Sequence, residues 1–391
     1  MADELVALRL APRQLGGWLQ RVWDAGDAVL PLDPAASEVE VRRLVHRLRP
    51  ARLISADGSG WRDEPLDAPG PVGEETALVI ATSGSTGRPK GVELSHAALR
   101  ASTDASVRRL GCRPGEAWLG CLPTHHVAGV QTLLRSWALD AEPVVHDRFD
   151  VGEVARADAA HVSLVPTQLA RLLEARVDVS RFVTVLLGGA RPPDGLLDRA
   201  RRAGAQVVVS YGMSETCGGC VYDGRPLDGV EVRVATDGRI AIRGPVLFSG
   251  YRGDPAATAA ALDGQGWFTS NDVGRWASGR LEVLGRADDV AISGGENVPL
   301  EAVALALRSH PGVSDAAATA RRDAEWGQVV VAVVVPRDAT DPPTLSELRA
   351  HVRERHPAAF APRRVVPVTE IPRDGLGKVP RAAIDALVDA G

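Results

Sequence analysis

Hydroxyl-bearing residues, glycines and a lysine are concentrated between positions 82 and 91 of the 391-residue chain. The segment reads TSGSTGRPKG and directly follows the apolar run Ala77 to Ala81, which has the length and flanks of a buried strand. Glycines let backbone N–H groups approach an anion closely, and hydroxyls add further donors. The spacing is not that of a Walker A loop, GxxxxGK[ST]. The segment therefore predicts a phosphate-binding loop of another kind at the end of a strand.

Lysine occurs at only two positions in this chain. Among its 45 Lys and Arg residues, only Lys90 and Lys378 are lysines. Codon bias in a GC-rich genome explains the excess of arginine, but it does not explain why two positions kept lysine. An ammonium is a compact point charge, whereas a guanidinium is a wide planar fork. A site that must place one charge on a phosphate or carboxylate oxygen can require lysine, so both residues are functional candidates.

Six further motifs lie along the chain: 123–129 (PTHHVAG), 188–190 (GGA), 211–216 (YGMSET), 267–272 (WFTSND), 285–289 (GRADD) and 372–379 (PRDGLGKV). Together with the loop at 82–91, their order resembles that of the adenylate-forming superfamily, which contains acyl-CoA synthetases, peptide-synthetase adenylation domains and luciferases. The resemblance extends from about residue 28 to residue 380. It implies an enzyme that uses ATP and Mg²⁺ to join a carboxylic acid to AMP, releases pyrophosphate, and then transfers the acyl group to coenzyme A.

The resemblance also implies which residues bind the nucleotide. Tyr211 offers a flat face for adenine, Asp272 can accept hydrogen bonds from both ribose hydroxyls, and Arg286 can place its fork on ribose or phosphate. The full set implied for ATP and AMP is Thr82, Ser83, Gly84, Ser85, Thr86, Gly87, Lys90, Gly189, Ala190, Tyr211, Gly212, Met213, Ser214, Asp272 and Arg286.

Three residues are implied for catalysis. Glu215 supplies the hard carboxylate oxygen that suits Mg²⁺, which neutralises the leaving pyrophosphate. Lys378 would place its charge where oxygens of the carboxylate and the α-phosphate meet. His126, rather than its neighbour His125, has the family spacing to Gly129 and would line the acyl site.

The remaining roles concern the acyl group, coenzyme A and motion. His126, Gln168, Gly188 and Gly189 are implied for the acyl substrate. Gly294 and Gly295 would let the pantetheine arm pass close to the backbone. Asp288 corresponds to the hinge about which the C-terminal domain would turn between the two half-reactions.

The pattern of apolar segments predicts an α/β protein. Strands are expected at 28–30, 52–54, 77–81, 183–187 and 206–210, helices at 39–48, 168–174 and 196–202, and a loop over 56–75. A β-rich subdomain is expected at about 228–285, with a hairpin around Thr236-Asp237-Gly238. We therefore predict a large domain over 1–287, shorter at its N-terminus than usual for the family, and a small mobile α+β domain over 289–391. In the latter, a helix at 300–309, a strand at 329–335 and a capping box at Thr344 are expected.

Composition excludes several other classes of protein. The net charge of −5 and the pI near 6.0 give no basic footprint for nucleic acid. No apolar run has the roughly 20 residues of a membrane helix, and the first residues do not resemble a signal peptide. A cytoplasmic enzyme is expected, and formation of homo-oligomers is left open. The CxxC of Cys217 and Cys220 has no second close pair, which disfavours a zinc site.

Within the superfamily, the segments 211–234 and 165–169 resemble the o-succinylbenzoate–CoA ligases of menaquinone biosynthesis, especially short actinobacterial ones. The CxxC would then provide small residues beside a tight pocket. Asn271 stands where the ribose motif usually has glycine, and asparagine tolerates left-handed backbone angles. The alternatives are another aryl- or acyl-CoA ligase, an enzyme that passes the acyl group to a carrier protein or other nucleophile, and a non-catalytic nucleotide-binding module. The last is disfavoured by the intact Lys378, Glu215 and Asp272.

Replacing Lys378 tests the function of the C-terminal motif. We expect Lys378→Ala to slow adenylation by at least ~10²-fold, the scale on which one preorganised charge stabiliser acts. Transfer of pre-made acyl-AMP to coenzyme A should be much less affected, because the motif that carries Lys378 is expected to be needed only in the first step. Pyrophosphate release and thioester formation, measured separately, check this expectation; equal losses in both would contradict it.

Overall fold

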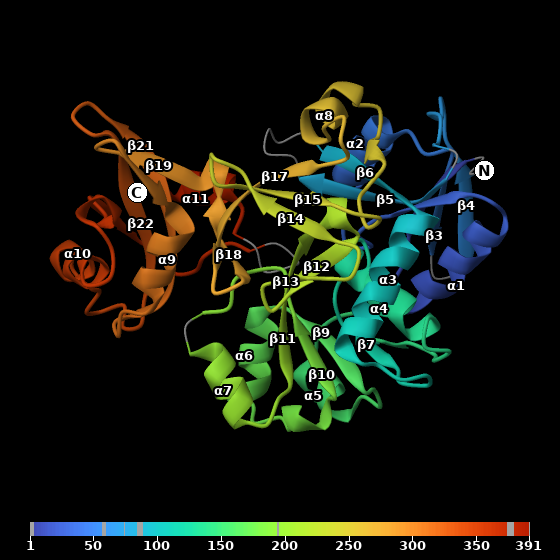
Figure 1. Cartoon of the computed structure of the whole chain (residues 1–391), viewed down its shortest axis with the longest axis horizontal. Coiled ribbons are helices and arrows are strands. Elements are labelled where there is room, and N and C mark those ends of the chain that lie inside the picture. The colour runs from blue at the N-terminus through green and yellow to red at the C-terminus, as the bar shows by residue number, and fades with distance from the viewer. Residues whose placement is uncertain are drawn as a thin grey trace. The chain divides into compact units, whose positions relative to one another are not determined.

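The computed structural model describes residues 4–56, 60–73, 75–83, 89–193, 195–373 and 379–390 (Figure 1), and for Ser83, Asp288 and Asn297 it describes the backbone only. The chain forms two compact units. Unit 1 comprises Met1–Gly189, Asp198–Val232 and Ile242–Thr269, and unit 2 comprises Ala190–Leu197, Arg233–Ala241 and Ser270–Gly391.

The first sheet of unit 1 has seven strands in the order β16-β6-β5-β2-β1-β3-β4. The interior strands β1, β2, β3 and β5 run parallel, whereas β4, β6 and β16 run antiparallel to their neighbours. Leu5 and Ala7 point into the core on one face of β1, and Val6 and Leu8 into the core on the other. The strands are β1 (Leu5–Arg9), β2 (Ala28–Pro31), β3 (Arg52–Ala56), β4 (Trp61–Pro65), β5 (Thr76–Ser83), β6 (Pro89–Ser95) and β16 (Gly250–Tyr251).

The second sheet of unit 1 also has seven strands, in the order β13-β12-β11-β10-β9-β7-β8. Strands β8, β7, β9, β10 and β11 run parallel, and β12 and β13 continue antiparallel from β11. They are β7 (Trp118–Gly120), β8 (Val144–Val145), β9 (His161–Leu164), β10 (Thr184–Leu187), β11 (Val207–Met213), β12 (Gly218–Tyr222) and β13 (Arg225–Pro226).

Helices cover both faces of the first sheet. Buried residues of α1, α3 and α4 pack on one face, and Val41 and Leu48 of α2 pack on the other (Figure 1). The helices that begin before residue 260 are α1 (Pro12–Asp24), α2 (Glu38–Leu48), α3 (His96–Leu110), α4 (Val127–Trp137), α5 (Val151–Arg156), α6 (Pro166–Glu174), α7 (Leu196–Arg202) and α8 (Pro255–Ala261), with short 3₁₀ turns η1 (Val179–Arg181) and η2 (Ser214–Thr216).

Arg252 ties segments of unit 1 that are far apart in sequence. Its side chain is 5% exposed, and its guanidinium donates to the carbonyl oxygens of Leu48 (2.5 Å) and Pro71 (2.8 Å) and to Glu93 Oε1 (3.2 Å). Five donors in a fixed fork can satisfy several buried acceptors at once. Arg252 thus holds the segment after α2 against the edge of the first sheet.

Unit 2 contains a sheet in the order β20-β19-β22-β21, and β23 pairs with β22. Its central strand β22 is apolar on both faces: Val330, Ala332 and Val334 pack with α9 and α10, while Val331 and Val333 pack with α11. The strands are β19 (Val290–Ser293), β20 (Glu296–Pro299), β21 (Val313–Asp323), β22 (Gly327–Pro336) and β23 (Arg364–Pro367). The helices are α9 (Leu300–Arg308), α10 (Leu345–Arg353) and α11 (Arg381–Ala390), with η3 (Ala287–Asp289) and η4 (Ala358–Phe360).

A smaller sheet precedes it, in the order β14-β15-β17-β18. Its strands are β14 (Glu231–Val234), β15 (Arg239–Arg243), β17 (Phe268–Ala277) and β18 (Arg280–Arg286). The unit boundaries at residues 232, 241 and 269 fall within β14, β15 and β17.

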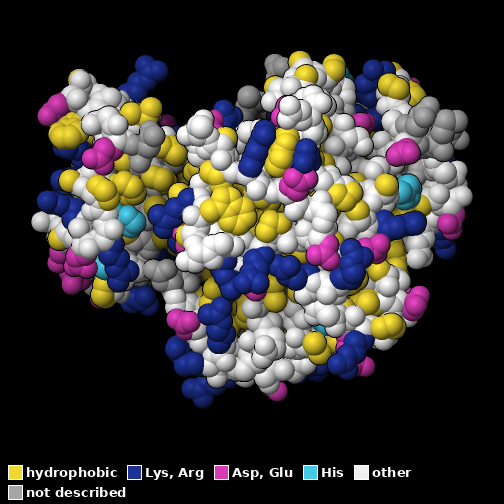
Figure 2. All heavy atoms as spheres, viewed as in Figure 1, with side chains coloured by type: hydrophobic (Ala, Val, Ile, Leu, Met, Phe, Trp, Pro, Cys, Tyr) yellow, Lys and Arg dark blue, Asp and Glu magenta, His cyan; other side chains and the backbone are white. Residues whose placement is uncertain are grey.

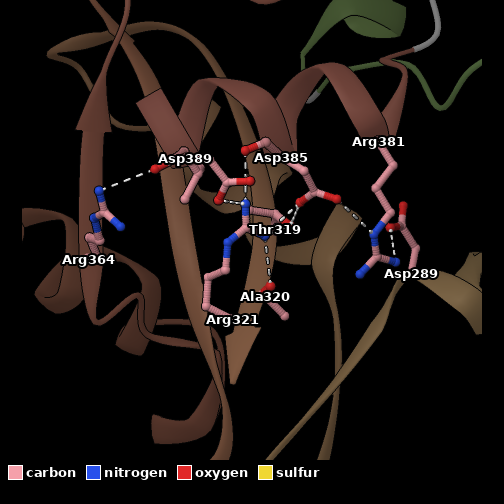
Figure 3. A network of polar contacts seen from close by, with 9 residues as sticks. Asp289, Thr319, Ala320, Arg321, Arg364, Arg381, Asp385 and Asp389 are labelled. Atoms are coloured by element: carbon pink, nitrogen blue, oxygen red, sulfur yellow. Dashed lines mark hydrogen bonds and ion pairs between the residues drawn. The ribbon is translucent and has the colours of Figure 1, made fainter. Parts of the chain in front are cut away.

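A polar network connects β21 to the last helix of unit 2 (Figure 3). Arg321 donates to the carboxylates of Asp385 (2.7 Å) and Asp389 (2.9 Å), and the Thr319 hydroxyl also donates to Asp385 (2.7 Å). At the start of the same helix, Arg381 pairs with Asp289 (3.1 Å), the residue after the predicted hinge. Burial raises the pKa of Asp385, but the bonds from Arg321 and Thr319 lower it more, so its pKa lies below the usual value.

The predicted α/β class is confirmed, and most predicted elements are present within two residues. The expected loop over 56–75 is wrong in part, because β4 forms within it and pairs antiparallel with β3. Many elements were not predicted individually, among them β1, α1, α3, α4 and α11. The capping box is confirmed: Thr344 Oγ1 accepts from Glu347 N, and Glu347 Oε2 accepts from Thr344 N.

Charged side chains of both signs are interspersed with apolar ones on the face drawn in Figure 2. None of the helices in the described part of the chain is long and apolar enough to span a membrane.

The network in unit 2 predicts a pH-dependent stability. Because the folded-state pKa of Asp385 is lowered, its contribution is fully present above the unfolded-state value of about 3.9 and is lost as the pH falls through the folded-state value. We expect Asp385→Asn to lower the free energy of unfolding by about 1 kcal/mol at pH 7, since the bonds are charged but partly exposed. Urea unfolding measures this difference, which should shrink at pH 3. In an Arg321→Met background most of the pH dependence should disappear; a difference that is the same at both pH values would contradict the prediction.

Candidate active site

The predicted phosphate loop lies at the tip of a β-hairpin. Thr82 of β5 pairs with Lys90 of β6, and Ser83 pairs with Pro89. Residues 84–88, and with them the predicted contacts of Gly84, Ser85, Thr86 and Gly87, lie outside the described residues. Gly91 closes the motif for a packing reason, because a Cβ there would lie 2.6 Å from Leu48 Cδ2. The two strands therefore hold both ends of the loop in fixed positions.

Lys90 and Glu215, from two separate motifs, meet at one tyrosine. The Lys90 Nζ lies 4.4 Å from the ring centroid of Tyr251, and the Tyr251 hydroxyl donates to Glu215 Oε1 at 2.9 Å. Burial, followed by the charge of Glu215, raises the pKa of Tyr251, so its hydroxyl remains protonated as a donor. The fold thus brings a cation and a carboxylate together around a neutral hydrogen-bond donor.

Glu215 is positioned by a tight backbone crossing. A Cβ on Gly212 would lie 2.0 Å from the carbonyl oxygen of Gly218, so β11 can reach β12 here only with glycine. The register shifts between Tyr211 and Gly212, and η2 follows at once. Thr216 then closes the turn, since its Oγ1 accepts from Met213 N (2.9 Å) and donates to Gly218 O (2.6 Å).

Tyr211, Gly212 and Met213 therefore form the end of β11, and all three are half-buried, as are Ser214 and Glu215. The nucleotide motif is thus a strand end followed by a turn. Its parallel neighbour β10 pairs in turn with β9, and Gly188 continues from β10 with its N–H bonded to Leu164 O at the end of β9. Gly189 has φ +82°, which glycine adopts without strain, and Ala190 after it is exposed.

The histidine motif starts helix α4. His126 is the N-cap residue, and its ring centroid lies 4.3 Å from that of His125; both side chains are half-buried. A Cβ on Gly129 would lie 2.3 Å from Pro123 O, so glycine lets the first turn pack on the preceding segment. The motif therefore fixes the direction in which the chain enters α4. The predicted contact of His126 with an acyl group stays a prediction.

Gln168 has a local structural role in addition to the one predicted. It is buried at 8% exposure, and its Oε1 accepts from Val165 N at 3.0 Å, which caps α6. Its carbonyl oxygen is therefore already engaged, which leaves the amide NH₂ as the group that a substrate could use.

The two predicted ribose residues lie opposite each other in unit 2. Asp272 on β17 is the cross-strand partner of Arg286 on β18. The Asp272 N–H donates to Ser270 Oγ (3.1 Å), and that hydroxyl donates to Ile240 O of β15 (2.9 Å). These bonds hold β17 against β15 near Asp272. Asn271 is not among the residues with positive φ, so its tolerance of left-handed angles is not used here.

The predicted coenzyme A glycines form a tight turn between β19 and β20. Gly294 and Gly295 have φ +59° and +82°, and two positive values are what a two-residue hairpin requires. A Cβ on Gly294 would also approach Trp326 Cε3 to 2.8 Å. Their geometry has this structural explanation, and contact with coenzyme A stays a prediction. Lys378 and the side chain of Asp288 lie outside the described residues.

Both cysteines of the CxxC are buried. Within the described residues, no group of three or more His, Cys, Asp and Glu side chains could hold a metal ion. Cys217 and Cys220 are 0% exposed, so in this structure they lie in the core rather than along an accessible pocket. Mg²⁺ usually takes one or two carboxylates together with substrate phosphates. As a single carboxylate, Glu215 fits that pattern, and the nucleotide would supply the remaining oxygen ligands.

Comparison with known proteins places the chain in a family. Residues 22–252 match the family model of AMP-binding enzymes, and residues 303–378 match that of the AMP-binding enzyme C-terminal domain. The chain belongs to the AMP-binding enzyme family. This confirms the resemblance found in the sequence.

A probable 2-succinylbenzoate–CoA ligase of Mycobacterium tuberculosis is 45% identical over 328 residues, which cover 80% of this chain and 85% of the relative. The o-succinylbenzoate CoA synthetase MenE of Bacillus subtilis, solved in complex with the acyl-adenylate intermediate OSB-AMP, is 27% identical with a TM-score of 0.86, over 98% of this chain and 88% of that one. The amide bond synthetase McbA of Marinactinospora thermotolerans is 28% identical with a TM-score of 0.87, over 99% and 90%.

Tyr251 contacts two residues of the candidate site, and the sequence motifs did not predict it. It lies in none of the seven motifs, so nothing in their spacing indicated it. Two signals were available: it is one of only three tyrosines in the chain, and it follows a glycine at the edge of a β-rich segment.

Asp272 provides a direct test of nucleotide binding. We expect Asp272→Ala to raise the apparent KM for ATP by about tenfold or more, because a hydrogen bond to a charged group contributes about 1.5–3 kcal/mol. Asp237→Ala, in the exposed turn between β14 and β15 of the same sheet, is the matched control and should leave that constant unchanged. Initial rates of adenylation at varied ATP measure both. An unchanged constant for Asp272→Ala would mean that the ribose is held elsewhere.

Proposed function

We propose that this AMP-forming acid–CoA ligase acts on o-succinylbenzoate. In the first half-reaction, a carboxylate oxygen of the acid attacks the α-phosphorus of ATP and pyrophosphate leaves. In the second, the thiol of coenzyme A attacks the carbonyl carbon of the acyl-AMP, and AMP leaves as the new thioester forms. The observation that carries the substrate assignment is the 45% identity to the mycobacterial relative across most of both chains.

The residues support the first half-reaction in separable ways. Lys90 presents its ammonium beside the phosphate hairpin, and within the described residues no carboxylate forms an ion pair with it. Glu215 offers a carboxylate oxygen to Mg²⁺, and the ion would supply neutralisation of the pyrophosphate charge. Asp272 and Arg286 offer a paired acceptor and donor set that suits ribose hydroxyls and phosphate.

The second half-reaction needs a different arrangement, because the thiol must enter after pyrophosphate leaves. We propose that the C-terminal domain, residues 289–391, changes its position relative to the preceding part of the chain at Asp288 between the steps. Support comes from the position of η3, which directly follows β18 and directly precedes β19. Rotation about one or two residues there would leave the sheets on both sides intact.

One alternative function has a specific observation in its favour. The similarity to the amide bond synthetase is as high as the similarity to MenE, with TM-scores of 0.87 and 0.86. An amine would then replace the thiol as the nucleophile in the second step, while adenylation would be the same. The nucleophile, and not the first half-reaction, separates the two functions.

A panel of acids and nucleophiles tests the proposal. We expect o-succinylbenzoate to support coenzyme A-dependent AMP formation at least ~10-fold faster than benzoate, succinate or a fatty acid, because buried polar groups that are left unpaired by a poorer acid cost about 1–3 kcal/mol. Without coenzyme A, pyrophosphate release should stop after about one turnover. Faster turnover with any of the other acids would discard the substrate, and turnover with amines but not with coenzyme A would favour amide synthesis.

A further inference from the structure

Tyr251 is fixed from three sides before any ligand is considered. It pairs with Val92 at the edge of the first sheet, and its N–H donates to Thr258 Oγ1 of α8 at 2.8 Å. Its ring packs against Phe248, with 4.9 Å between centroids, and the residue is only 8% exposed. Both backbone and ring are therefore immobilised in the core of unit 1.

Two polar groups use this fixed ring in different ways. The hydroxyl donates to Glu215 Oε1 at 2.9 Å, and the ring face receives the Lys90 ammonium at 4.4 Å. A cation over an aromatic face is attracted by the ring quadrupole without being neutralised. Lys90 is thus held in place while its charge stays available for a phosphate.

We propose that Tyr251 is a positioning residue for nucleotide–metal binding, which fixes the Glu215 carboxylate and the Lys90 ammonium relative to each other. The expected effect on catalysis rests on the proposed adenylation function, whereas the expected effect on metal binding does not.

The need for such a residue follows from the small number of protein ligands. In the described part of the chain, Glu215 belongs to no cluster of metal-ligating side chains, so the ion would be held by this carboxylate and by phosphate oxygens. A single carboxylate with free torsions would lose conformational entropy on binding the ion. The bond from Tyr251 to one oxygen removes that freedom beforehand and leaves the other oxygen for the ion.

Another tyrosine in the chain provides a matched control. Tyr222 is 1% exposed, and its hydroxyl lies 2.7 Å from Ser106 Oγ, with Arg135 Nη2 at 3.4 Å. It is also a buried tyrosine with a hydrogen-bonded hydroxyl, but it contacts neither Glu215 nor Lys90. A general effect of losing a buried hydroxyl would appear in both tyrosines, whereas a positioning effect would appear only at Tyr251.

Binding of Mn²⁺ with a non-hydrolysable ATP analogue measures the effect without any acid substrate. By electron paramagnetic resonance, Tyr251→Phe should weaken Mn²⁺ binding about tenfold, since it keeps the ring and loses the hydroxyl. Tyr251→Leu removes both contacts and should in addition weaken binding of the metal-free analogue at least about threefold. Tyr222→Phe should bind both like the wild type. In kinetics, Tyr251→Phe should slow adenylation about tenfold and leave thioester formation from pre-made acyl-AMP within about twofold.

The outcomes separate this inference from the proposed function. Wild-type Mn²⁺ binding by Tyr251→Phe, or an equal loss in Tyr222→Phe, would overturn the positioning role. If Tyr251→Phe does not fold, Thr258→Val takes its place: it releases the Tyr251 backbone from α8 and should weaken Mn²⁺ binding about two- to threefold, whereas wild-type binding would overturn the inference. If the wild type does not adenylate o-succinylbenzoate but Mn²⁺ binding still depends on Tyr251, only the substrate assignment fails.

Discussion

The backbones of β11 and β12 approach each other at Gly212 and Gly218 too closely for any side chain, since a Cβ on Gly212 would lie 2.0 Å from Gly218 O. This contact forces a register shift and a short turn at the end of a buried strand. Because the turn is so tight, Cys217 takes φ +53°, a left-handed value unusual for a residue other than glycine. Ser214 and Glu215 lie at this turn, so the position of the metal-binding candidate depends on the glycine contact.

The turn is also connected to helices α3 and α4 through buried hydrogen bonds. The carbonyl oxygen of Cys217 accepts from Gln131 Nε2 (2.9 Å) on α4 and from Ser102 Oγ (3.3 Å) on α3. Helix α4 begins at His126, the residue predicted to line the acyl pocket. A buried carbonyl left without donors is costly, so these bonds are strongly maintained. One helix therefore positions His126 at its start and supports the Glu215 turn along its length.

The strands and helices that were predicted from the sequence have apolar runs flanked by clear turn signals. Prediction failed for β4, whose residues WRDEP have no apolar pattern; this strand forms only because β3 offers an open edge. The motifs predicted which residues carry chemistry, and the structure pairs Asp272 with Arg286 and brings Lys90 near Glu215. The contacts of Tyr251 could not be predicted, because they join segments more than 30 residues apart and depend on how the edge strand β16 packs.

The same geometry clarifies why lysine persists where arginine is otherwise used. The guanidinium of Arg252, the neighbour of Tyr251, donates its hydrogen bonds to buried carbonyl oxygens and to Glu93. Contact with a ring does not by itself require lysine, because Arg363 lies over Trp326 at 4.0 Å. Position 90 differs because its cation is also expected to bind a phosphate. A planar fork stacked on a ring spreads its donors around the ring edge, whereas an ammonium is a compact point charge. In the proposed site, the compact ammonium of Lys90 would keep its three donors for a phosphate, and the carboxylate of Glu215 would keep its charge for Mg²⁺.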